Sequence, residues 1–374
     1  MKEKPHYVVL DGLRGVAALM VLVFHVFDAC SSNIIPHGYL AVDMFFVLSG
    51  FVIGYAYDDR WQQGLTAGRF FRRRLIRLHP MVLVGGLLGG LVFLLQGRTM
   101  WDGTVCSLGW TVVSIVCCML LLPALPGCPT EVRGFGEYFP LNGPFWSLFY
   151  EYIGNVLYAL LLRRLRTRWL ALVAVISGGF VLHTCLACGC LGVGWSAADG
   201  GWWQGLTRML FPYSVGMLMA RRFRPVRVRH AFFWCSLLIL AAGLAPTIDL
   251  PPANGLYDFL CAAFLFPAIV WMAASDSRSG DAAMRLGRLL GDVSYPLYAI
   301  HYPFMLILFG RLGFDGTPYD PHLVADEWPL ALAIVVACPL LAWLLFRYYN
   351  QPLRRRLNKA ERKEFGRFCH DRGK

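Results

Sequence analysis

The first apolar segment of the chain carries three ionisable side chains on one face of the helix that it predicts. Arg14 and His25 are eleven positions apart, which at about 100° per residue places them only ~20° apart around a helix, and Asp11 lies on the same stripe. The helical rise separates Arg14 from His25 by roughly 16 Å. An ionisable residue inside a membrane span costs about 2.5–3.5 kcal/mol on insertion scales, so this stripe is expected to face a cavity or polar partners. A neutral imidazole facing a cavity can serve as a general base, and the alternative is structural hydrogen bonding.

A cluster of five arginines within nine residues precedes the third apolar segment. Guanidinium groups bind phosphate through two parallel hydrogen bonds, so the cluster predicts a site for an anionic group at the membrane entrance. The alternative is that these charges only orient the protein in the membrane, although five arginines exceed what orientation needs. The cluster consists of Arg69, Arg72, Arg73, Arg74 and Arg77.

A carboxylate lies inside the apolar segment NGPFWSLFYEYIG. Glu151 follows Ser147 by one helical turn, and Trp146 lies beside them. A carboxylate in such a segment must be paired, neutralised or exposed to water. We therefore expect these residues to line a polar interior site.

Two further segments combine polar groups with aromatic residues. In SYPLYAIHYPF, Ser294, Tyr298 and His301 fall on one helix face because they are spaced at i, i+4 and i+7. They suit the binding of a polar substrate, and the alternative is a belt of interfacial aromatic residues. In GYLAVDMFFVLSGFVIGYAY, Asp43 and Ser49 are candidates for substrate contact. A hinge or close helix packing explains that second segment as well, and Ser49 is not in the G-x-S-x-G setting of a nucleophile.

The composition is that of a membrane protein rather than a soluble one. Of 374 residues, 57% are hydrophobic and only 16% are charged, against roughly 25% charged residues in soluble domains. The net charge of +12 comes from basic residues confined to short loops, a distribution that marks the cytoplasmic side of a membrane protein and does not indicate nucleic-acid binding. No metal site is expected, because the histidine and cysteines at 183–190 lack a second ligand pair at zinc-like spacing.

Eleven apolar segments predict an all-α integral membrane protein, a polytopic bundle of about ten transmembrane helices with one re-entrant or irregular segment. The basic stretches at 69–77 and 163–168 both look cytoplasmic, yet three segments lie between them, so one of the three is not expected to span. We assign a transmembrane domain to 1–352 and a basic cytoplasmic tail to 353–374. The segments are 8–27, 38–57, 80–96, 104–122, 144–162, 169–190, 206–220, 231–247, 257–274, 289–311 and 328–347.

These blocks, in this order, resemble the acyltransferase-3 family of membrane acyltransferases, many of which O-acylate sugars of surface polysaccharides. The resemblance spans nearly the whole chain, from Leu10 to about Pro352. It rests on LDGLRGVAAL with Arg14-x10-His25, VDMFFVLSGF, the RxxR of Arg74 and Arg77, WSLxxE from Trp146 to Glu151, and SYPLYAIH from Ser294 to His301.

The resemblance implies an enzyme that moves an acyl group, expected to be acetyl, from acyl-CoA to a hydroxyl of a carbohydrate or similar acceptor. It implies a multi-pass protein of the bacterial inner membrane with no tightly bound cofactor, and it leaves the oligomeric state open. His25 is then the catalytic base, and Arg74 with Arg77 meets the phosphates of the donor. Glu151 is a candidate to orient His25 or the acceptor hydroxyl. The complete expected sets are His25, Arg14, Asp11 and Glu151 for catalysis, Arg73, Arg74 and Arg77 for the donor, and Asp43, Ser49, Trp146, Ser147, Ser294, Tyr298 and His301 for the substrate.

Two alternatives stay open at this point. A transporter or flippase of a polar or glycolipid substrate also has polar residues on interior helix faces and a re-entrant element. Within the enzyme hypothesis, a covalent route through Cys30 is a second possibility, although nothing around that thiol indicates an activated cysteine. The arginine cluster, combined with a histidine about half a membrane away, favours the enzyme.

Overall fold

The chain folds into a bundle in which every regular element of the described residues is a helix. The computed structural model describes residues 7–29, 34–197, 201–276, 279–311 and 321–371. This architecture confirms the all-α class predicted from the apolar segments. The α-helices are α1 (Val8–Ala29), α2 (Ala41–Gln62), α3 (Ala67–Leu95), α4 (Leu108–Met119), α5 (Phe145–Leu160), α6 (Thr167–Cys188), α7 (Trp202–Arg222), α8 (Ala231–Leu244), α9 (Pro251–Leu260), α10 (Phe266–Ala274), α11 (Asp281–Arg311), α12 (Pro321–Leu345) and α13 (Gln351–Asp371).

Eight helical stretches in the described part of the chain are long and apolar enough to cross a bilayer. The helix α4 is not one of them, because its 12 residues extend about 18 Å, less than the ~30 Å hydrocarbon core. The segments predicted at 206–220 and 231–247, which form α7 and α8, are not among the eight either, so the prediction of about ten spans with one irregular segment was too high. With only α3 and α5 spanning between them, the basic stretches at 69–77 and 163–168 lie on the same side of the membrane.

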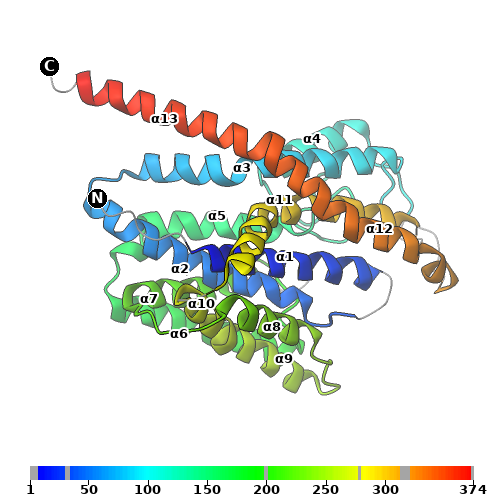
Figure 1. Ribbon diagram of the computed structural model, residues 1–374. Coiled ribbons are helices and arrows are strands. Elements are labelled where there is room, and N and C mark those ends of the chain that lie inside the picture. Colours follow the sequence, from blue (N-terminus) through cyan, green and yellow to red (C-terminus); the bar gives the residue numbers. More distant parts are fainter. Residues whose placement is uncertain (1–6, 30–33, 198–200, 277–278, 312–320, 372–374) are drawn as a thin grey trace.

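Two of the membrane-spanning helices, α1 and α2, lie at the centre of the bundle. Figure 1 shows α1 and α2 in the middle, α3 and α4 on one side, and α6 to α10 on the other. Of the helix pairs in the described part of the chain, α1 and α11 pack together most extensively, followed by α2 and α7. A π-helical turn (Phe346–Asn350) joins α12 to α13, and α13 projects past the bundle at the end where α3 begins (Figure 1).

The helices α1 and α11 run parallel and approach closely at glycine residues. A Cβ atom on Gly12 would lie 2.7 Å from Gly287 Cα, and one on Gly291 would lie 2.7 Å from Asp11 Cβ. Small residues let two helix backbones come this close in a membrane. The register set by these glycines determines which side chains of α1 meet those of α11, including the polar ones described below.

Basic segments that are far apart in the sequence meet at one end of the bundle. Arg221 donates a 2.8 Å hydrogen bond to the carbonyl of Leu165, which joins the end of α7 to the loop before α6. Arg73 of α3 forms a 3.0 Å ion pair with Glu361 of α13. These contacts agree with the grouping of basic loops on one side that the sequence predicts.

Candidate active site

Two prominent cavities in the described part of the bundle are lined by residues of α1, α2 and α11. The arginine chamber, of about 440 Å³, has six arginines and three carboxylates in its wall. The histidine chamber, of about 510 Å³, contains His25. Val42 and Tyr298 line both chambers. The charged residues of the arginine chamber are Arg14, Arg74, Arg77, Arg288, Arg354, Arg355, Asp11, Glu151 and Asp292.

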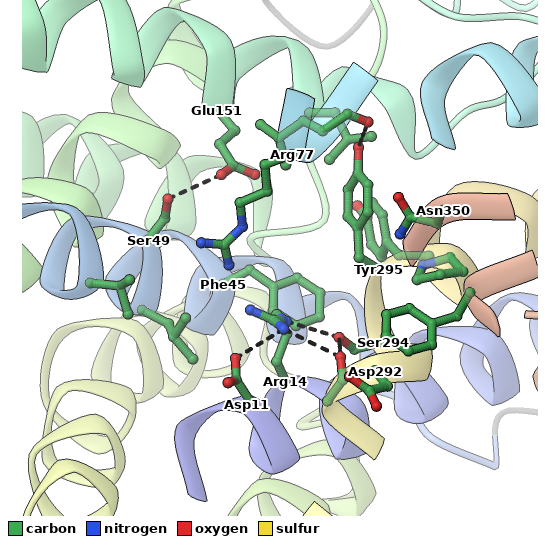
Figure 2. A pocket seen from close by; sticks show the side chains of 18 of the residues that line it. Asp11, Arg14, Phe45, Ser49, Arg77, Glu151, Asp292, Ser294, Tyr295 and Asn350 are labelled. Atoms are coloured by element: carbon green, nitrogen blue, oxygen red, sulfur yellow. Dashed lines mark hydrogen bonds and ion pairs between the residues drawn. The ribbon is translucent and has the colours of Figure 1, made fainter. Parts of the chain in front are cut away.

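Arg14 joins α1 to α11 in the wall of the arginine chamber (Figure 2). Its Nη2 atom lies 3.0 Å from Asp11 Oδ1, and its Nε donates a 2.8 Å hydrogen bond to Ser294 Oγ. A further hydrogen bond of 3.3 Å runs from Nη2 to the carbonyl of Gly291. Asp11 and Arg14 thus belong to the arginine chamber, although they share a helix stripe with His25.

Glu151 is paired inside the same chamber, as a carboxylate in a membrane interior must be. Its Oε1 accepts a 2.7 Å hydrogen bond from Arg74 Nη2 and a 3.2 Å hydrogen bond from Ser49 Oγ. Arg77 points into the chamber in Figure 2, and no carboxylate among the described residues lies within 4 Å of its guanidinium group. Arg77 is therefore the arginine of the RxxR pair that can bind an anion without breaking an existing ion pair.

His25 and His301 form a hydrogen-bonded pair at the histidine chamber. His25 Nδ1 lies 3.1 Å from His301 Nε2, and His301 Nδ1 lies 3.1 Å and 3.0 Å from the carbonyl oxygens of Leu297 and Tyr298. Carbonyl oxygens only accept, so His301 Nδ1 carries a proton and its Nε2 is an acceptor. His25 Nδ1 must then donate, which leaves the lone pair on His25 Nε2. That tautomer is the one required of a general base.

Sequence reasoning missed two side chains next to this pair, Tyr302 and Glu137. The Tyr302 ring packs edge-on against the His25 ring at a centroid distance of 5.3 Å, and its hydroxyl donates a 3.2 Å hydrogen bond to Glu137 Oε1. Burial raises the pKa of the Glu137 carboxyl to about 7, an effect opposed by the charge of Arg133. Tyr302 directly follows the SYPLYAIH motif, whereas Glu137 lies in the irregular loop before α5, where no periodic pattern identifies a site residue.

The rest of the histidine chamber is mostly aromatic and apolar, with few polar groups. Asp28, almost one turn after His25, adds a second carboxylate to the wall. Concave apolar sites with a few well-placed polar groups are typical of small-molecule binding. The aromatic residues of the wall are Phe24, Tyr39, Trp101, Phe135, Trp146, Trp195, Tyr298, Tyr302 and Phe309.

Asp43, expected at the substrate, lies instead in a buried ion pair with Arg208 of α7. Arg208 Nε and Nη2 donate to the two carboxylate oxygens at 3.0 Å and 2.8 Å, and the side chains are 2% and 1% exposed. A buried carboxylate needs such a partner, which explains why Asp43 is not part of either chamber wall. Arg208 itself lines the histidine chamber, so Asp43 acts on that chamber through Arg208. The sequence analysis did not single out Arg208, a lone charge within the apolar segment at 206–220.

The structure divides the other expected residues between the two chambers. Glu151 and His25 lie in different chambers, so His301, and not Glu151, orients the His25 ring. Arg73 and His301 line neither chamber. Arg73 forms an ion pair with Glu361, and His301 hydrogen bonds to His25. Cys30 lies outside the described residues. Ser49, Ser147 and Ser294 line the arginine chamber, Trp146 lines the histidine chamber, and Tyr298 lines both.

Comparison with known proteins identifies the family of the chain. A family model described as an acyltransferase domain matches residues 7–347, which is nearly the whole chain. The chain belongs to the acyltransferase-3 family. This membership favours the acyltransferase over the transporter alternative. No solved structure matches this acyltransferase-3 chain.

Named relatives of this acyltransferase-3 protein cover most of its length. It is 29% identical to acyltransferase MdmB of Streptomyces mycarofaciens over 94% of this chain and 92% of that protein. It is 25% identical to the putative membrane-bound transacylase BcsY of Komagataeibacter xylinus over 90% of this chain and 81% of that protein. A shorter stretch, 20% of this chain and 12% of the other, is 36% identical to the peptidoglycan O-acetyltransferase OatA of Listeria monocytogenes. The chain is therefore a multi-pass membrane acyltransferase.

Proposed function

We propose that this protein is an O-acyltransferase that moves an acyl group, expected to be acetyl, from acyl-CoA to a hydroxyl of a carbohydrate or similar acceptor. The observation that carries the proposal is the His25–His301 pair, which leaves the Nε2 lone pair of His25 free at the wall of a ligand-sized chamber. A positioned imidazole of this kind contributes about 10²–10⁴-fold to proton transfer in acyl transfer reactions.

The proposed reaction uses His25 first as a base and then as an acid. His25 Nε2 removes the proton of the acceptor hydroxyl while the oxygen attacks the thioester carbonyl and the new C–O bond forms. The C–S bond then breaks, and the leaving thiolate takes the proton from His25. While the imidazole is charged, its Nδ1–H donates to the neutral His301 Nε2, which stabilises the cation and keeps the ring oriented.

The donor is proposed to bind in the arginine chamber. Six arginines against three carboxylates give that chamber an excess of positive charge, which suits the several phosphates of coenzyme A. Arg77 is free of ion pairs with the described carboxylates, whereas Arg74 is held by Glu151, so Arg77 is proposed as the principal phosphate ligand. The basic loops near this chamber favour a cytoplasmic location for its mouth and for α13, in a bacterial inner membrane.

The acceptor is proposed to bind in the histidine chamber. Aromatic faces pack against the apolar faces of sugar rings, and the carboxylates of Asp28 and Glu137 can accept hydrogen bonds from hydroxyl groups. The name of the Listeria relative, a peptidoglycan O-acetyltransferase, supports a carbohydrate acceptor for the family stretch that the two proteins share.

The test is acyl transfer by the purified full-length protein in detergent, with isotopically labelled acetyl-CoA and a panel of sugar hydroxyl acceptors. We expect His25→Ala to lower the rate by about 10²–10⁴-fold. The matched control is His183→Ala, because His183 is an exposed residue of α6 that lines neither chamber. A wild-type rate in His25→Ala would exclude this mechanism. Transfer from a labelled acyl phosphate or acyl lipid, but not from acetyl-CoA, would replace the donor and leave the role of His25 standing.

A further inference from the structure

The two chambers are separated where α2 and α11 face each other. Val42 of α2 and Tyr298 of α11 are the two described residues that line both cavities, and their exposed fractions are only 7% and 5%. These two side chains therefore lie at the boundary between the arginine chamber and the chamber that contains His25. We call Val42 and Tyr298 the partition.

Specific contacts hold the Tyr298 side chain in the closed position. Its hydroxyl lies 2.5 Å from Ser147 Oγ and donates a weaker 3.3 Å hydrogen bond to the carbonyl of Pro144. The Phe45 ring packs edge-on against the Tyr298 ring at a centroid distance of 5.5 Å. Both Phe45 and Ser147 lie on the arginine side of the partition. A ligand arriving from that side therefore meets the residues that keep Tyr298 in place.

We propose that Val42 and Tyr298 form a movable partition that admits the thioester end of the donor from the arginine chamber, while the acceptor enters the histidine chamber from the opposite side. The inference rests on the proposed function, since it presumes a donor with an anionic head and a thioester end. Rotation of the Tyr298 side chain breaks the hydrogen bonds to Ser147 and Pro144 and the ring contact with Phe45. The backbone of Tyr298 stays fixed, because its carbonyl lies 3.0 Å from His301 Nδ1.

A closed partition has a chemical consequence for the waiting donor. Water that accompanies the acceptor in the histidine chamber is kept away from a thioester that has not yet passed Tyr298. Excluding water in this way prevents hydrolysis of an activated group before the acceptor is bound. Tyr298 is also one turn from His301, so one residue of the partition and one residue of the histidine pair belong to adjacent positions on α11.

The experiment compares two acetyl donors that differ in the need to pass the partition. Acetyl-CoA carries the anionic head expected in the arginine chamber, whereas S-acetyl-N-acetylcysteamine is an uncharged fragment small enough to enter the histidine chamber with the acceptor. Val42→Trp should lower kcat/KM for acetyl-CoA by about tenfold or more relative to kcat/KM for the fragment, because the added bulk lies in a packed contact that only acetyl-CoA has to pass. Val156→Trp, at an exposed position of α5 that lines neither chamber, is the matched control.

Tyr298→Phe provides the second variant, because it keeps the ring and removes only the hydroxyl. Losing the contact with Ser147 should raise the ratio of kcat/KM for acetyl-CoA to kcat/KM for the fragment by about 2–10-fold. A fall with both donors would assign Tyr298 to the reacting atoms and overturn the partition. Unchanged use of acetyl-CoA in a folded Val42→Trp protein would overturn it as well. Failure of the wild-type protein with both donors would instead refute the proposed function.

Discussion

His25 Nδ1 lies 3.1 Å from His301 Nε2 although the two residues are 276 positions apart in the chain. The contact depends on the parallel packing of α1 and α11, which brings the first apolar segment against the penultimate long one. The proposed catalytic base and the residue that fixes its tautomer therefore come from opposite ends of the sequence. Any change that shifts one helix against the other alters the base itself.

We predict that His301→Ala lowers kcat by about 10²–10⁴-fold while KM for acetyl-CoA changes little, because the His25 ring loses the acceptor that fixes its tautomer. His301→Gln should restore part of the rate, since a glutamine oxygen can accept from His25 Nδ1. Steady-state kinetics of both variants provide the measurement. Equal loss in the alanine and glutamine variants, or a change confined to KM, would contradict an orienting role.

We predict that Arg74→Ala and Arg77→Ala differ in stability although both weaken donor binding. Removing Arg74 leaves Glu151 without its 2.7 Å partner and should cost about 1–3 kcal/mol of unfolding free energy. Arg77→Ala removes no ion pair with a described carboxylate, so its melting temperature should stay near that of the wild type. Both variants should raise KM for acetyl-CoA.

Thermal unfolding in detergent, together with KM for acetyl-CoA, tests this pair. The double variant Arg74→Gln with Glu151→Gln is the control, because it removes both charges together and should recover stability without recovering donor affinity. If Arg77→Ala bound the donor like the wild type, the phosphates would have to bind elsewhere.

The helices and the membrane class could be predicted from the sequence because apolar runs of about twenty residues have few other stable states. The basic loops also identified the region of the irregular α4. Three crossings between two cytoplasmic loops would leave those loops on opposite sides of the membrane, so one of the three segments could not span it. The Arg14 and His25 stripe was predicted correctly as a shared helix face. What it did not indicate was that the two ends of the stripe belong to different chambers.

The partners of the site residues could not be predicted, because they depend on which helices pack together. Asp43 was expected at the substrate, but α7 brings Arg208 against it. Glu151 was a candidate to orient His25, but α3 supplies Arg74 to it, and α11 supplies His301 to His25. Glu137 comes from a loop, where no helical or strand period marks a buried carboxylate.

We predict that Glu137 makes the stability of the protein depend on pH. Burial raises the pKa of its carboxyl to about 7, above the ordinary value of 4.5, so the folded state favours the protonated form. As pH rises from about 4.5 through 7, the unfolded state loses its proton first, and stability falls. The groups that face this carboxyl are Arg133, whose charge opposes the shift, Tyr302, which hydrogen bonds to it, and Glu131, which adds to the shift.

Glu137→Gln tests this dependence because the amide is neutral at every pH and its oxygen can still accept from Tyr302. The difference in unfolding free energy between the variant and the wild type should grow in favour of the variant between pH 5 and pH 8, by at most on the order of 3 kcal/mol. Melting temperatures across that range provide the measurement. Parallel curves for the two proteins would show that Glu137 does not titrate there.

We predict that Gly12→Ala destabilises the protein and lowers activity, whereas Gly179→Ala does neither. The new Cβ of Gly12→Ala would lie 2.7 Å from Gly287 Cα, which is backbone and cannot rotate away, so α1 and α11 must separate. Such overpacking costs about 1–3 kcal/mol. Gly179, in α6, has no atom within 4 Å of its added Cβ apart from the backbone of its own helix and its chain neighbours, and alanine is favoured over glycine in a helix by about 0.5–1 kcal/mol.

The two glycine variants make the same chemical change, so they separate helix propensity from the α1–α11 contact. Both should be compared by melting temperature in detergent and by kcat for acetyl transfer. Because Gly12 and His25 are both on α1, a displaced helix should lengthen the hydrogen bond between His25 and His301 and lower kcat more than KM. If Gly12→Ala kept full activity and matched Gly179→Ala in melting temperature, the glycine contact would not set the position of the base.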